Sequence, residues 1–133
     1  MLVIRQEQID AFREYMTRQF ENQMLSHVQR YFHYDFQVLG EQNVRKMIRY
    51  GIEHSKSYGL VMEDDVSKYI EMMFAFGRNF DTDSAYSWAA QILKDEDLTG
   101  AMKMERVYKE VEQHLAEAHS SMSEKHENEA VVK

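Results

Sequence analysis

The stretch QEQIDAFREYMTRQFENQMLSHVQRYFHY, residues 6–34, decides the fold class of this chain. Its apolar side chains recur at steps of three and four residues, which is the periodicity of an α-helix with one apolar face. They are Ile9, Phe12, Met16, Phe20, Met24, Val28 and Phe32. The spacing predicts one long N-terminal helix of about seven turns. Such a helix is not stable alone in water, so other elements or another chain must cover its apolar face.

Apolar spacing predicts four further helices after this one. Gly59 is expected to end the second helix of the chain in the left-handed conformation. Asp83 or Ser84 is expected to cap the fourth helix, and Thr99 the fifth. In chain order the four predicted helices cover residues 44–58, 63–76, 84–93 and 99–118.

Composition supports an all-α fold, a compact bundle of about five helices. The 133 residues include no proline and only five glycines, which favours long uninterrupted elements over a turn-rich β architecture. The length fits a single helical domain, predicted over residues 1–119. Residues 120–133 are expected to form a polar, partly disordered C-terminal tail.

The charge and hydropathy patterns exclude several classes of partner. The net charge is -7, and residues 51–133 carry nine Lys and Arg against seventeen Asp and Glu, so nucleic-acid binding is disfavoured. Arg45, Lys46 and Arg49 are expected to form only a solvated helix face. No run of eighteen apolar residues and no signal-peptide core is present, so we expect a cytoplasmic protein that does not bind membranes.

Motifs that carry chemistry are missing from the sequence. The six histidines lack the spacing of zinc or di-iron ligands, and the absence of cysteine removes thiolate sites. Asp81 and Asp83 begin a calcium-like loop, but Tyr86 and Ile92 occupy the positions that require glycine and glutamate. No nucleophile motif or phosphate-binding loop is present. We therefore expect no catalytic, cofactor or metal site and no enzyme activity.

The apolar inventory is larger than a small helical bundle requires. Ten methionines and sixteen aromatic residues are present, and methionine packs adaptably against varied partners. Part of this surplus is expected to be exposed, as a groove for a partner helix or as a homodimer seam, which explain it equally well. The predicted partner-binding residues are Tyr69, Met72, Met73, Phe76 and Phe80.

Four strings give the chain a family resemblance: VIRQEQIDAF at 3–12, YGIEHSKSYGLVMEDDVSKYI at 50–70, FGRNFD at 76–81 and SWAAQIL at 87–93. Over most of residues 2–95 the chain resembles small helical accessory proteins encoded beside bacterial type VI secretion spike and toxin-effector genes. It differs from their pattern in having Ser87, where proline is frequent, before Trp88.

The resemblance implies a non-catalytic accessory role. The expected function is that of a chaperone or adaptor that binds a secreted effector or spike component in the producing cell. The alternative is an immunity protein, whose acidic second half would neutralise a cognate toxin by electrostatic complementarity.

Overall fold

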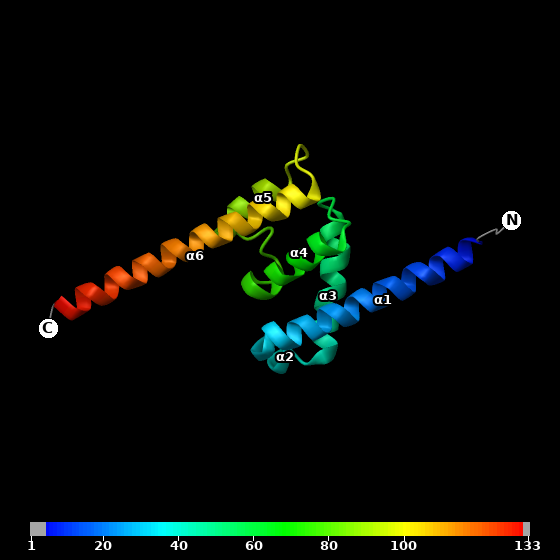
Figure 1. The fold of residues 1–133 in the computed structure, drawn as a ribbon, viewed down its shortest axis with the longest axis horizontal. Helices are drawn as coiled ribbons and strands as arrows, with labels where there is room; N and C mark the ends of the chain where they lie inside the picture. The colour runs from blue at the N-terminus through cyan, green and yellow to red at the C-terminus, as the bar shows by residue number, and fades with distance from the viewer. Residues whose placement is uncertain (1–4, 132–133) are drawn as a thin grey trace. The chain divides into compact units, whose positions relative to one another are not determined.

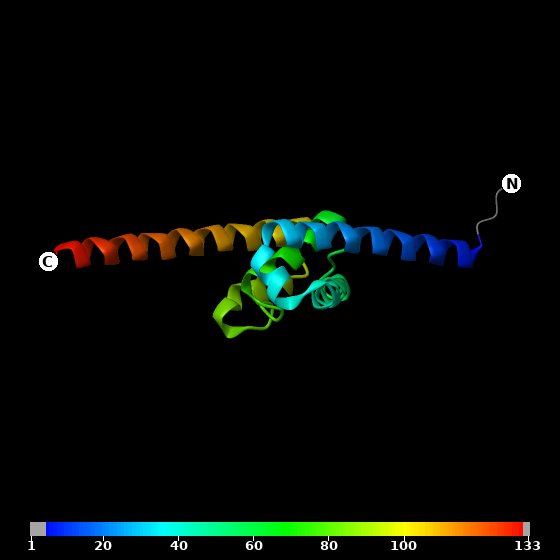
Figure 2. The same ribbon diagram turned by 90° about the horizontal axis from the view of Figure 1, so that it is seen from below.

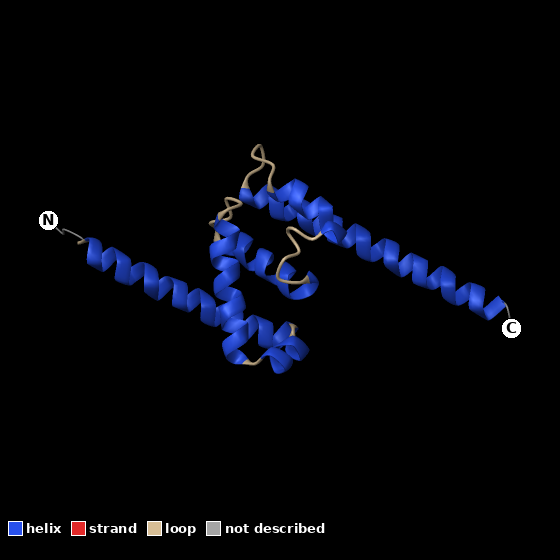
Figure 3. Ribbon diagram, turned by 180° about the vertical axis from the view of Figure 1, so that it is seen from behind, coloured by secondary structure: helices blue, strands red, loops and turns tan. Residues whose placement is uncertain are grey.

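Helices make up all the regular structure that the computed structural model describes, which is the backbone of residues 5–131 and the side chains of residues 5–118 (Figure 3). The all-α class predicted from the sequence is confirmed. The elements are α1 (Gln6–Tyr31), α2 (His33–Leu39), α3 (Glu41–Lys56), α4 (Glu63–Phe76), the short 3-10 helix η1 (Ser84–Tyr86), α5 (Ser87–Leu93) and α6 (Gly100–Val131).

The internal contacts of the chain divide it into two compact units, Met1–Phe80 and Asp81–Lys133. The first unit holds α1 to α4, and the second holds η1, α5 and α6. No pattern in the sequence indicated a division after Phe80. The single domain over residues 1–119 stays a prediction, and the predicted tail, residues 120–133, lies beyond the described side chains.

In the first unit, α3 runs across α1, and α4 packs against α3 (Figure 1 and Figure 2). The sequence predicted one helix through residue 34, but α1 ends at Tyr31 and α2 begins at His33. The break lies at Phe32, whose φ of -125° and ψ of 48° are not helical. There the Phe32 ring lies 5.8 Å from the ring of Phe74 on α4, so this contact accompanies the turn of the chain out of α1.

The crossing of α3 and α4 depends on Gly51. A Cβ atom at residue 51 would lie 2.7 Å from Ile70 Cγ1 and 2.9 Å from Met73 Sδ, closer than van der Waals contact allows. Only a residue without a Cβ atom fits this crossing as it stands. The buried apolar side chains around the crossing include Val44, Ile48, Leu60, Val66, Tyr69, Ile70 and Met73.

The second unit pairs α5 with the first turns of α6. Thr99 caps α6 as predicted, because its Oγ1 accepts a hydrogen bond from the Met102 amide at 3.2 Å. Asp83 accepts a hydrogen bond from the Ala85 amide at 2.9 Å, but it caps the 3-10 helix η1, and the predicted helix 84–93 is divided into η1 and α5, which has no side-chain cap. Trp88 stacks on His114, with ring centroids 5.3 Å apart. Among the residues that the structure describes, no helix combines the length and apolarity needed to cross a bilayer.

Candidate interaction surface

The residues predicted to bind a partner lie mainly inside the first unit. Tyr69, Met72, Met73 and Phe80 are buried, and Phe76 is half-buried. Met72, Met73 and Phe74 are consecutive, so α4 buries side chains on more than one side. Since a buried side chain reaches a partner only if the fold opens, the exposed apolar residues of the first unit form the candidate interaction surface instead.

Exposed apolar side chains of the first unit gather on the N-terminal half of α1, on the connection between α3 and α4, and around α2, where Tyr31, Tyr34, Val38 and Leu39 are exposed. On α1, Phe12 is 64% exposed, and Tyr15 and Met16 are also exposed. On the connection, residues 57–62, Val61 is 76% and Met62 67% exposed. The sequence held one signal for the connection, because Val61 and Met62 are adjacent apolar residues between Gly59 and the acidic start of α4.

The apolar face of α1 changes from buried to exposed along the helix. Phe20, which is 7% exposed, and Met24 and Val28 lie in the core, whereas Phe12 and Met16 are exposed. A step of four residues turns about 40° further than a full helical turn, so Phe12 points about 120° away from Met24. The core covers the Met24 side, and the N-terminal half of α1 extends past α3 and α4 (Figure 1).

An open groove lies where α1, α3, α4 and the connection meet. Its volume is about 230 Å³, which is smaller than a typical small-molecule pocket and suits one or two apolar side chains of a protein. We call it the α1–α3–α4 groove. Its lining is mostly apolar and consists of Met16, Thr17, Phe20, Ile52, Lys56, Leu60, Val61, Glu63 and Val66.

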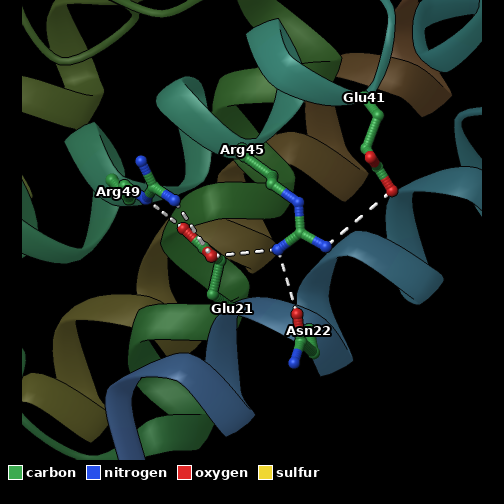
Figure 4. Close-up of polar contacts among 5 residues, drawn as sticks. All are labelled: Glu21, Asn22, Glu41, Arg45 and Arg49. Atoms are coloured by element: carbon green, nitrogen blue, oxygen red, sulfur yellow. Dashed lines mark hydrogen bonds and ion pairs between the residues drawn. The ribbon is translucent and has the colours of Figure 1, made fainter. Parts of the chain in front are cut away.

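A buried carboxylate fixes α1 against α3 beside this groove. Glu21, on α1, has a side chain that is only 6% exposed, and it accepts hydrogen bonds from Arg49 and, at 3.0 Å, from Arg45 on α3 (Figure 4). Arg45 also donates to Asn22 Oδ1 at 2.9 Å and lies 3.8 Å from Glu41.

This arrangement corrects the expectation that Arg45 and Arg49 form only a solvated helix face. The Arg45 side chain is 22% exposed and that of Arg49 62%, so both reach from the surface of α3 to one buried partner on α1. The periodicity of α1 placed Glu21 on its polar face, and only the crossing of the two helices buries it. A charged pair of this kind positions the helices because a misaligned Glu21 would be buried without a donor.

A second side-chain contact ties α1 to α4. His27 Nε2 lies 2.8 Å from Glu71 Oε1, and both side chains are about one-third exposed. Together with the Glu21 contacts, it holds α1 on the two helices that form the other walls of the groove. The groove is therefore built on helices held in place rather than on a loop alone.

No cluster of three His, Asp or Glu side chains able to hold a metal ion occurs among the described residues. The groove offers apolar side chains, with Lys56 and Glu63 at its rim. Chemically, this surface can bury apolar side chains of another protein and pair charges of either sign at the edge.

Comparison of the chain with protein-family models, with curated proteins and with solved structures gives no match.

Proposed function

We propose that this protein is a non-catalytic accessory factor that binds another protein, acting as a chaperone or adaptor for a type VI secretion effector or spike component. The observation that carries the binding role is the α1–α3–α4 groove with Val61 exposed at its edge. The link to type VI secretion rests on the sequence resemblance of residues 2–95.

We propose an apolar helical segment of the partner as the occupant of the groove. The small volume accepts one or two side chains at a time, and helices present anchors at such spacing every three to four residues. Val61 and Met62 are both mostly exposed, so a partner that covered them would remove apolar surface from water. Each Å² removed would stabilise the complex by about 25 cal/mol. Lys56 and Glu63 would pair with polar residues that flank the anchors.

The test uses the producing strain with the gene deleted and restored as wild type, as Val61→Glu or as Val38→Glu. Val38 is a matched control because it is 66% exposed and lies on α2, outside the groove lining. The readout is the abundance and export of the effector encoded beside the gene. We expect wild type and Val38→Glu to restore both, and Val61→Glu to fail.

Equal restoration by both variants would exclude the groove as the binding site. Normal effector abundance and export in the deletion strain would contradict the chaperone or adaptor role altogether. Before either conclusion, circular dichroism of the purified variants must show wild-type helicity, which we expect because both valines are exposed.

The excess of acidic residues favours a second candidate, the immunity protein. Residues 51–133 carry a net charge of -8, which would attract the basic active site of a toxin. The same deletion strain separates the two functions. Killing of the deletion strain by wild-type siblings, with normal effector abundance, would favour the immunity role, whereas loss of the effector without killing favours the adaptor role.

A further inference from the structure

Residues 5–19, which are the N-cap Arg5 and the N-terminal half of α1, present an apolar side that the described part of the chain leaves exposed. Ile9 is half-buried, and every other described residue of this half is exposed. Phe12, Tyr15 and Met16 are the large apolar side chains on it. We call Ile9, Phe12, Tyr15 and Met16 the α1 stripe.

All the carboxylates of this half of the helix lie on the side away from the α1 stripe. At 100° per residue, the α1 stripe shares its side with Arg5, Gln8 and Gln19 and with no carboxylate. The carboxylates of this segment, Glu7, Asp10 and Glu14, lie on the opposite side with Arg18, whereas Arg13 lies at the edge of the stripe, about 40° from Ile9. An apolar side that carries no carboxylate and has Arg13 only at its edge can pair with an identical side without burying like charges, provided that the two Arg5 side chains lie at opposite ends.

We propose that residues 5–19 form a dimer interface, in which the α1 stripe packs against the α1 stripe of a second copy in an antiparallel pair. This inference is independent of the proposed function, since it concerns the protein alone and a side of α1 that meets the α1–α3–α4 groove only at Met16.

The area available matches a small but specific dimer. A second copy that covered the α1 stripe, together with the apolar stems of the polar residues beside it, would bury about 600 Å² on each copy. The total of about 1,200 Å² is at the lower end of specific interfaces. Interfaces at this lower end are typical of weak association, so we expect a dissociation constant of roughly micromolar order.

The antiparallel orientation follows from the spacing of the stripe and from electrostatics. With the two-fold axis beside residue 14, Phe12 of each copy faces Met16 of the other, and Ile9 faces Gln19. In a parallel pair, the two Arg5 side chains and the two positive helix ends would lie together, which is unfavourable.

Sedimentation equilibrium of the full-length chain tests the interface. We expect wild type to reach twice the 15.9 kDa chain mass with a micromolar dissociation constant, and Phe12→Glu to raise that constant at least about tenfold. Glu14→Gln, which changes the opposite side of the same helix segment, is the matched control and should dimerise as wild type does. Ile9→Ser is a second stripe variant, expected to weaken the dimer in the same direction.

Three results would overturn the interface. They are a wild-type monomer at about 100 μM, a dimer that Phe12→Glu and Ile9→Ser leave unchanged, and equal weakening by Glu14→Gln. Far-UV circular dichroism accompanies each variant. Retained helicity is expected for both stripe variants, and a stripe variant that dimerises normally while folded counts against the proposal.

Because the natural chain has no cysteine, introduced thiols report the orientation without background. Phe12→Cys and Met16→Cys chains are mixed and oxidised, each disulfide forming by loss of two electrons and two protons to an added oxidant such as copper phenanthroline. The antiparallel pair predicts that the mixed 12-to-16 disulfide prevails. A prevailing 12-to-12 disulfide, or no disulfide in a sample that is dimeric, would contradict it.

Discussion

Gly51 on α3 lies so close to Ile70 on α4 that a side chain of even one carbon at residue 51 would lie 2.7 Å from Ile70 Cγ1. Glycine destabilises a helix by about 1 kcal/mol relative to alanine, but at this position only glycine allows the two helices to cross so closely. The crossing brings Ile52, at the next residue of α3, to the α1–α3–α4 groove, so the position of one wall depends on it.

Gly51→Ala should therefore destabilise the first unit despite its better helix propensity. We expect the free energy of unfolding to fall by about 1–3 kcal/mol, because Ile70 and Met73 must move to admit the methyl group. Urea denaturation followed by far-UV circular dichroism measures this. In the Gly51→Ala, Ile70→Ala double variant the loss should be smaller than the sum of the two single losses, and simple additivity would contradict the contact.

Glu21→Ala should destabilise the protein more than Glu41→Ala. Removing Glu21 leaves Arg45, whose side chain is half-buried, without its main acceptor, and we expect a loss of about 1–3 kcal/mol in the free energy of unfolding. Glu41 also pairs with Arg45, but its side chain is 54% exposed, so its removal should cost less than about 0.5 kcal/mol. Equal losses in denaturant titrations would argue against Glu21 as the residue that fixes α1 on α3.

Two phenylalanines on α1 test how the helix divides into buried and exposed halves. Phe20→Ala should lower the free energy of unfolding by about 3–5 kcal/mol, because Phe20 is 7% exposed. Phe12→Ala, at a residue 64% exposed, should change it by less than about 0.5 kcal/mol at protein concentrations where the chain is monomeric. Similar losses for both, measured by thermal denaturation of dilute samples, would show that the N-terminal half of α1 is packed.

Two methionines distinguish the predicted partner-binding residues from the exposed ones. Met73→Asp should unfold or severely destabilise the first unit, since it places a carboxylate at a fully buried position beside Gly51. Met62→Asp should leave the fold intact, since Met62 is 67% exposed. Proton NMR spectra show whether each variant is folded. A well-dispersed spectrum for Met73→Asp would contradict the buried position of Met73 and make it a candidate for partner binding again.

The all-helical fold could be predicted because apolar periodicity and cap residues are local properties. Thr99 and Gly59 act where the sequence placed them, and α4 has the predicted bounds, whereas Asp83 caps η1 instead of α5. The break at Phe32 could not be predicted, because Phe32 continues the three-and-four spacing. Its departure from helical geometry accompanies a contact with Phe74, which is distant in the sequence.

The surface was harder to predict than the fold, because exposure depends on which side of each helix other helices cover. Phe12 and Phe20 belong to one periodic series, yet the gradual turn of that series around α1 leaves only Phe20 in the core. The methionines of α4 looked like surplus surface, but Met72 and Met73 are buried. Arg45 and Arg49 looked solvated, because their partner Glu21 is more than twenty residues away in the sequence.

The proposed role depends most on partner binding at the α1–α3–α4 groove. Amide hydrogen exchange of the purified protein, with and without the purified product of the neighbouring effector gene, measures this directly. We predict slower exchange on partner addition in residues 16–20 of α1 and 52–66 around the connection, and no change around Val38. Unchanged exchange in both segments, or protection confined to residues outside the groove, would contradict the account.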